Sequence, residues 1–208
     1  MNDVEVIAAI VAVFVLFAAV LVIVIIRTRH SGRTDIVDIP KSPERIYGER
    51  GERIAGEVLR DLMKEGDVLL ENVRISYDGK SAEIDKLVIN SNGVFIIEVK
   101  NYAGELFGGE DDRKWTKRKE DGGGNVFLKI VDNPIKQVKR QKHIFANYLR
   151  ENGVDVWVSG YVLLVHQNSP VESEFILSNR EEIDRKIHSP GRKRLSKDKI
   201  ENIRKLCF

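Results

Sequence analysis

The sequence has very little cysteine: Cys207, the next-to-last of 208 residues, is the only one. A single thiol excludes an intramolecular disulfide and a cysteine-based zinc site, and it is typical of a reducing compartment. The chain also lacks a strong charge of either sign, because 34 basic and 32 acidic residues leave a formal net charge of +2. Gross charge therefore does not indicate a nucleic-acid partner. Neither internal repeats nor a glycine-rich phosphate loop is present.

One long hydrophobic run lies near the start of the chain. Val6–Ile26 contains 21 residues without a charge, which is long enough for a helix to cross about 30 Å of hydrocarbon. Asp3 and Glu5 precede the run, so it lacks the basic start of a cleavable signal peptide. We expect a retained, single-pass transmembrane helix over residues 4–27 of a protein of the cell membrane.

Basic residues follow this run directly: Arg27, Arg29 and Arg33. The charge asymmetry predicts an N-terminus outside the cell and a C-terminal domain in the cytoplasm. Residues 28–47 are polar and have no apolar period, so we expect a linker there. The remaining residues, 48–208, are enough for one folded domain.

Several helices are predicted in this domain. The first covers Gly48–Glu65, where an apolar stripe extended backwards reaches Glu52. Glu52 is thus the acid expected to point toward a sheet; the alternative is a solvated first-turn glutamate favoured by the helix dipole. A second helix begins at Asn133-Pro134 and ends at Asn152-Gly153, and two more, capped by Asn179 and Ser196, finish the chain.

Two strands carry the most informative pattern. Gly93–Lys100 is rich in β-branched residues and ends in Glu98-Val99-Lys100, whose two charges share one face of a strand. Ala82–Ile89 precedes it across a turn-rich segment. If the hairpin loop holds an even number of residues, Asp85 lies opposite Glu98 or Lys100. Two carboxylates and an ammonium would then meet at one end of the hairpin. A structural cross-strand ion-pair cluster is the alternative.

Basic residues are the other candidates. The polar stretch Glu105–Asn125 places them around Trp115, and the second helix has them mostly outside its packed face. Such residues beside an aromatic ring could follow a phosphate backbone and stack on a base, although a solvated loop has the same composition. The candidate nucleic-acid-binding residues are Lys114, Trp115, Lys117, Arg118, Lys136, Lys139 and Arg140.

The order of these elements resembles the core of the PD-(D/E)XK nuclease superfamily, and the motifs resemble its NERD (nuclease-related) domain. The matching segments are Gly48-x-x-Gly51-Glu52, Glu83-Ile84-Asp85, Gly93 to Gly104 with Glu98-Val99-Lys100, and Asn133-Pro134-x-x-Gln137. The resemblance covers roughly 48–165. It implies an α/β (α+β) fold with a restriction-endonuclease-like αβββαβ core, in which helices flank a central mixed sheet.

The resemblance also implies roles for particular residues. Asp85 and Glu98 would hold Mg²⁺, or Mn²⁺ in its place, together with the Val99 carbonyl, and Glu52 would complete the metal shell. Lys100, ordinarily protonated, would position the attacking water and stabilise the pentavalent phosphate. Gln137 would orient the substrate or the lysine.

Together these features predict a membrane-tethered, Mg²⁺-dependent nuclease that hydrolyses phosphodiester bonds of DNA in the cytoplasm. The alternatives are a non-catalytic module that keeps the fold and binds nucleic acid or protein at the membrane, and a scaffold whose polar cluster is structural. The binding module is less favoured because clustered carboxylates repel phosphate.

Overall fold

The computed structural model describes residues 43–166, 171–191 and 193–208, which belong to one compact unit. The predicted membrane helix at residues 4–27, and most of the predicted linker at residues 28–47, lie outside the described residues. Among the residues that are described, no helix is both long and apolar enough to cross a membrane. Helix α2 (Pro43–Leu62) begins five residues before the predicted start at Gly48. A proline at its first position is compatible with this start, because the N–H that proline lacks would be unpaired there.

The domain is built on a mixed five-stranded sheet in the order β1-β2-β3-β7-β8. Strands β1 (Val68–Tyr77), β2 (Lys80–Asn90) and β3 (Gly93–Lys100) are antiparallel neighbours. Strand β7 (Val158–Leu164) runs parallel to β3, and β8 (Ile176–Leu177) runs parallel to β7. This confirms the predicted mixed α+β architecture with a central sheet.

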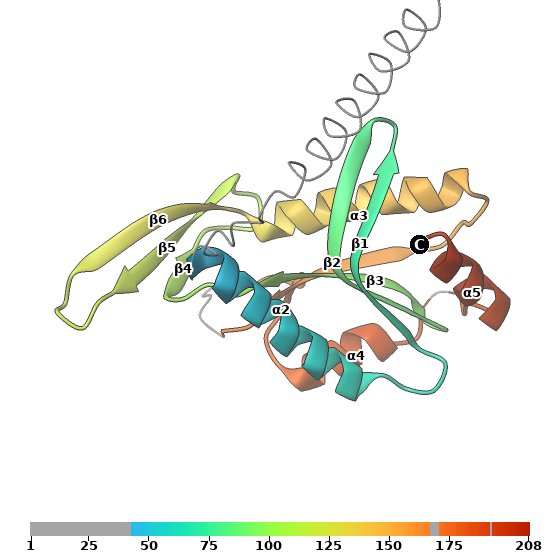
Figure 1. Cartoon of the computed structure of the whole chain (residues 1–208), viewed down its shortest axis with the longest axis horizontal. Helices are drawn as coiled ribbons and strands as arrows, with labels where there is room; N and C mark the ends of the chain where they lie inside the picture. Colours follow the sequence, from blue (N-terminus) through green and yellow to red (C-terminus); the bar gives the residue numbers. More distant parts are fainter. Residues whose placement is uncertain (1–42, 167–170, 192) are drawn as a thin grey trace, which may run out of the picture. The chain divides into compact units, whose positions relative to one another are not determined.

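Helices cover both faces of the sheet (Figure 1). Helix α2 and helix α4 (Arg180–His188) pack on one face, and helix α3 (Pro134–Glu151) and helix α5 (Lys197–Lys205) pack on the other. Strand β3 is therefore buried on both sides, which explains its nearly continuous apolar sequence. Ile96 belongs to the core under α3, whereas Ile97 and Val99 belong to the core under α2. By alternation, Glu98 falls on the α3 side.

The predicted helix caps are confirmed at the three helices where a cap is described. The side chain of Asn133 accepts a hydrogen bond from the backbone N–H of Ile135 at the start of α3. Asn179 caps α4 and Ser196 caps α5 in the same manner. These caps satisfy backbone donors that have no partner inside the helix.

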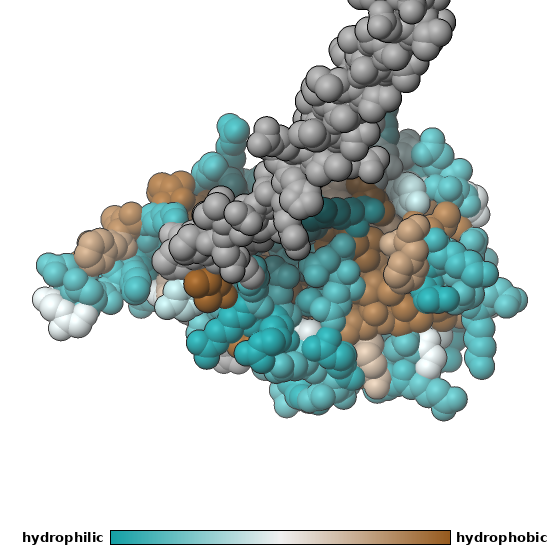
Figure 2. Space-filling view, viewed as in Figure 1, coloured by the Kyte–Doolittle hydropathy of each residue, from teal (hydrophilic) through white to brown (hydrophobic). Residues whose placement is uncertain are grey.

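A second, three-stranded sheet is inserted between β3 and α3. It consists of β4 (Glu105–Phe107), β5 (Lys114–Glu120) and β6 (Val126–Asp132), and Figure 1 shows it projecting from one end of the domain. Strand β6 follows the polar stretch Glu105–Asn125 in the sequence. This outer strand is largely exposed although apolar, and its hydrophobic residues are visible along the projecting arm in Figure 2: Val126, Phe127, Leu128 and Ile130.

The β1–β2 hairpin leaves the main sheet halfway along its length. Pairing between β2 and β3 ends at Lys86↔Ile97, and the outer part of the hairpin continues alongside α3 (Figure 1). Asn72, on β1, adopts a left-handed φ of 55° between the pairs Glu71↔Lys86 and Val73↔Ile84. The side chain of Gln141, on α3, then binds the Glu83 carbonyl at 2.8 Å. Asp85 therefore lies at the point where β2 separates from β3.

Helix α2 approaches the end of β3 closely at Gly51. A Cβ atom at this position would lie 2.4 Å from the Cβ of Asn101, which follows β3 directly. A side chain at Gly51 would thus push the first turns of α2, and Glu52 with them, away from the sheet. Gly48, one turn earlier, has no atom within 4 Å of the corresponding position.

We expect Gly51→Ala to lower the free energy of unfolding by about 1–3 kcal/mol, because overpacking strains a close contact. The matched control Gly48→Ala should leave stability unchanged or raise it by up to about 1 kcal/mol, since alanine favours a helix. Urea unfolding followed by circular dichroism measures both. Equal stability of the two variants would contradict the close contact.

Candidate active site

Glu98 is the centre of a polar cluster at the end of β3. Its side chain is only 1% exposed, and both of its carboxylate oxygens accept hydrogen bonds from other side chains. Oε1 accepts a hydrogen bond from Lys100 Nζ in an ion pair, and Oε2 accepts one from Gln141 Nε2 at 2.5 Å. The buried charge is thus held by one ammonium and one amide, as a carboxylate removed from water requires.

Asp85 faces the same strand end. Its Oδ2 accepts a hydrogen bond from the backbone N–H of Val99 at 2.8 Å, just beyond the point where β2 stops pairing with β3. The pKa of Asp85 is raised to about 6, chiefly because burial penalises its charge and also because the Glu98 carboxylate is near. The hydrogen bond from Val99 and the charge of Lys100 oppose this shift only in part.

The parity condition for this arrangement is met. Asn90 pairs with Gly93, so the hairpin loop contains two residues, Ser91 and Asn92. Continuing the register by one step beyond Lys86↔Ile97 brings Asp85 opposite Glu98. The prediction that Asp85, Glu98 and Lys100 converge at one end of the hairpin agrees with these contacts.

Lys100 is held in its charged form. Burial alone would lower its pKa, but the charge and the hydrogen bond of Glu98 outweigh burial, and the pKa is raised above its ordinary value. Tyr102, two residues further on, has a raised pKa mainly because of its burial. The ammonium of Lys117 lies 5.6 Å from the centre of the Tyr102 ring, so the inserted sheet reaches the edge of the cluster.

Glu52 approaches the cluster from the opposite layer. Burial is the largest cause of its raised pKa, followed by the negative charge of Asp85. Because α2 begins at Pro43, Glu52 lies in its third turn and not in the first turn, as the predicted start at Gly48 had implied. Its position is fixed by the contact between Gly51 and Asn101, and by the hydrogen bond from Asn101 Nδ2 to the Tyr47 carbonyl at 2.6 Å. The role of Glu52 at this site stays a prediction.

The fit of a divalent cation can be tested on these side chains. Within the described residues, no group of three or more His, Cys, Asp or Glu side chains is arranged to hold a metal ion, so Glu52, Asp85 and Glu98 do not form a ready-made shell. Two buried side-chain oxygens near this strand end, Gln141 Oε1 and Asn101 Oδ1, have no hydrogen-bond partner there. Mg²⁺ prefers oxygen ligands and needs only one or two carboxylates, so the donor set fits it.

The amide that contacts the cluster is Gln141, which was not among the predicted residues. It is 2% exposed and lies one helical turn after Gln137. Within the described part of the chain, the Gln137 side chain makes no hydrogen bond, and it is only partly buried. The signal for Gln141 was available in the sequence, because it lies three residues after Val138 and four before Phe145 on the packed face of the helix.

The prediction that Trp115 stacks on a base is wrong. Its side chain is 1% exposed, packs in the core with Leu106 and donates a hydrogen bond to the Gly109 carbonyl at 2.9 Å. Trp115 is the only buried residue of strand β5. Trp115 therefore anchors the inserted sheet to the domain.

Most of the other predicted nucleic-acid-binding residues already have partners. Lys114 pairs with Asp132, Arg118 with Glu105 and Glu120, and Lys139 with Glu110. The Arg140 guanidinium donates to the Ser81 carbonyl at 2.9 Å. Lys136 is exposed and has no carboxylate partner in the described part of the chain. The predicted basic surface is therefore weaker than its composition indicated.

Comparison with known proteins identifies the family. The model of the nuclease-related domain, NERD, matches residues 47–165, which is more than half of the chain. The chain belongs to the NERD family. The matched NERD segment contains Glu52, Asp85, Glu98, Lys100, Gln137 and Gln141.

The chain is also similar to a protein of Bacillus anthracis that is named as uncharacterized. The two are 32% identical over 111 residues, which cover 52% of this chain and 48% of the relative. The chain thus spans about half the length of that relative. No solved structure matches the chain significantly.

The raised pKa of Asp85 predicts a pH dependence of stability. The folded NERD domain keeps the Asp85 proton up to about pH 6, whereas the unfolded chain loses it near the ordinary value of 3.8. Between these values the folded state binds more protons, so this group lowers the free energy of unfolding as pH rises. A shift of about two pKa units corresponds to at most about 3 kcal/mol.

In metal-free buffer, Asp85→Asn should therefore be more stable than the wild type at about pH 7.5 and nearly equal to it at about pH 4. Urea unfolding at both pH values measures the difference. Glu83→Gln, an exposed acid on the same strand that pairs with Arg74, serves as the matched control and should show no such change. A pH-independent effect of Asp85→Asn would contradict the raised pKa.

Proposed function

We propose that this NERD domain is a metal-dependent nuclease that hydrolyses phosphodiester bonds of DNA. The observation that carries the proposal is the convergence of Asp85, Glu98 and Lys100 where β2 separates from β3. Carboxylates can hold a divalent cation, and an ammonium can stabilise charge that develops on a phosphoryl group. The element order α2-β1-β2-β3, then α3-β7, supports the restriction-endonuclease-like core that the resemblance implies.

Asp85 and Glu98, with the Val99 carbonyl, are the residues that we propose to hold Mg²⁺ or Mn²⁺. Glu52 would join them from α2, where its pKa already responds to the charge of Asp85. When bound, the cation would supply positive charge to offset the charge developing at phosphorus. The raised pKa of Asp85 is compatible with this role, because two adjacent carboxylates favour a cation between them.

The other side chains have roles that do not involve the metal directly. Lys100 remains protonated at neutral pH and would position the attacking water and donate to a phosphate oxygen. Gln141 holds Glu98 through its Nε2 and prevents the carboxylate from rotating. Gln137, one turn nearer the start of α3, would contact the substrate. Asp85 must lose its proton to bind a cation, so activity should fall as pH drops below about 6.

One observation favours a second candidate, a binding module without catalysis. Both oxygens of Glu98 are engaged by Lys100 and Gln141, and the cluster is thus satisfied as a structural ion pair. In that case the fold would bind nucleic acid or a protein partner and the acids would only stabilise the end of β3. Metal-dependent cleavage separates the two functions.

The cellular setting is also a proposal. The apolar run Val6–Ile26 and the basic residues after it support a NERD domain tethered to the cell membrane on the cytoplasmic side. Such a tether would confine cleavage to DNA that approaches the membrane.

We expect the protein to cleave DNA with Mg²⁺ or Mn²⁺ and not with EDTA. Asp85→Asn and Glu98→Gln should each lower the rate at least about a hundredfold, because each removes a proposed metal ligand. Lys100→Ala should lose cleavage but keep metal binding. Glu83→Gln should cleave like the wild type, since this side chain is exposed and paired with Arg74. Wild-type rates in both acid variants would exclude the nuclease function.

A further inference from the structure

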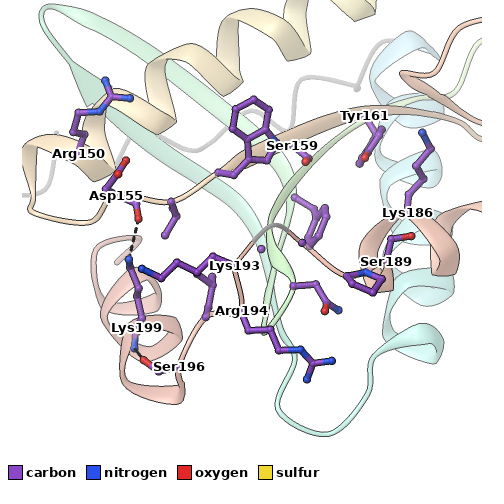
Figure 3. A pocket seen from close by; sticks show the side chains of 18 residues that line it. Arg150, Asp155, Ser159, Tyr161, Lys186, Ser189, Lys193, Arg194, Ser196 and Lys199 are labelled. Carbon is purple, nitrogen blue, oxygen red and sulfur yellow. Dashed lines mark hydrogen bonds between the residues drawn. The ribbon is translucent and has the colours of Figure 1, made fainter.

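A cavity of about 760 Å³ lies where strands β3 and β7 begin (Figure 3). It is lined by the first residues of β3, the first residues of β7 and the segment between α4 and α5. On β3 its lining begins at Gly93, five residues or roughly 17 Å of strand before Glu98, and on β7 it extends to Tyr161, which pairs with Ile97. We call it the Trp157 pocket, because Trp157 contributes to its lining and is 69% exposed.

Positive charge is concentrated in the Trp157 pocket. Its lining has a single carboxylate, Asp155, against five cationic side chains: Arg150, Lys186, Lys193, Arg194 and Lys199. Among the described residues, none of the five has a carboxylate partner. Arg150 donates to the amide oxygen of Asn147 at 2.9 Å, and Lys199 donates to the backbone carbonyl of Asp155 at 2.8 Å.

The contrast with the rest of the surface is clear. Many basic residues elsewhere form ion pairs, among them Arg60, Arg74, Lys114, Arg118 and Lys139. A protein with a formal net charge of only +2 therefore has a local excess of four positive charges, five minus one, around one cavity. Such an excess attracts an anion of several charges.

The segment that carries Lys193 and Arg194 is anchored to the β2–β3 turn. A Cβ atom at Gly191 would lie 2.1 Å from the carbonyl oxygen of Asn92, so the two backbones are in direct contact. The backbone N–H of Leu195 donates to the Ser91 carbonyl at 2.8 Å. Both flanks of the basic pair are thus fixed, which reduces the entropy lost when a ligand binds.

Aromatic side chains accompany these charges. Trp157, Tyr161 and Phe95 all contribute to the lining of the pocket. Figure 3 shows Arg150 and Lys186 on opposite sides of the pocket, with Lys193 between them. The cavity is larger than a single phosphate needs, and its cations are spread rather than focused on one point. Phosphates on the cations and a base against the aromatic residues would use both features.

We propose that the Trp157 pocket is a second nucleic-acid site, which binds nucleotide units of a single strand away from the acid cluster. Lys193, Arg194 and Lys199 bind the backbone phosphates, and Trp157 contacts a base. Binding here requires no hydrolysis and no metal, so the proposal goes beyond the nuclease function and does not depend on it.

The test measures binding of the full chain to a fluorescent oligothymidylate of about twelve nucleotides by anisotropy, in EDTA so that cleavage is absent. Lys193→Ala/Arg194→Ala should weaken binding about tenfold or more, and the slope of log K against log salt should decrease by about 1.4, since two phosphate contacts are lost. Arg74→Ala/Lys205→Ala removes the same charge at exposed positions outside the pocket and should have little effect. An equal loss in both double variants, or none in either, would overturn the proposal.

Two further ligands identify what is recognised. Inorganic polyphosphate that binds as tightly as the oligonucleotide would contradict contact with a base, and free thymidine monophosphate that binds as tightly would contradict recognition of a strand. Trp157→Phe in the same assay should weaken oligonucleotide binding by less than the double variant. Lys193→Ala/Arg194→Ala should weaken oligonucleotide binding by the same factor when Asp85→Asn is also present. The result of this test therefore does not depend on the acid cluster.

Discussion

The burial of a charged carboxylate at the end of an apolar strand is the constraint on which the site depends. Glu98 lies two residues before the end of a strand that is covered by helices on both faces, and its side chain is buried there. The surrounding structure compensates with Lys100 from the same strand and Gln141 from α3. Breaking such a buried pair by removing one partner is strongly unfavourable, so both partners are fixed in place. The position of the Glu98 carboxylate therefore depends on how α3 packs against the sheet.

The same region is where the sheet changes shape. Strand β2 separates from β3 at Asp85. The backbone N–H of Val99 therefore has no backbone partner on β2 and donates a hydrogen bond to the Asp85 carboxylate instead. An acid at this point has one oxygen engaged by the protein and lies close to a second acid, and its pKa rises to about 6. The geometry thus places a titratable group, an ammonium and a buried carboxylate at one edge. Glu52 reaches this edge because Gly51 lets α2 approach Asn101.

Much of this could be predicted from the sequence because the decisive rules are local. Strand alternation put Glu98 and Lys100 on one face, and a two-residue turn decided where Asp85 lies. The predictions failed where packing between distant segments determines which side chains are buried. Trp115 is buried because its side chain packs in the core with Leu106, which the surrounding basic residues concealed. Gln141 was missed in favour of Gln137, although its helical position matched the packed face.

The Trp157 pocket could not be predicted at all, since its cations come from α3, α4, α5 and the segment before α5, which meet only in the folded domain. The acid cluster lies near the end of β3, whereas this pocket lies where β3 and β7 begin. One end concentrates negative charge, where a phosphodiester needs a cation to approach. The other concentrates positive charge, where a phosphate backbone can bind directly.

The measurement that tests the central claim most directly is a titration of the full chain with Mn²⁺, followed by electron paramagnetic resonance. At about pH 7.5 the wild type should bind Mn²⁺, and Glu98→Gln should bind it about 10- to 100-fold more weakly. Wild-type affinity should also fall at about pH 5, because Asp85 is then protonated. Equal Mn²⁺ affinity in the wild type and in Glu98→Gln, or no binding by either, would contradict the account of this cluster as a metal-dependent active site.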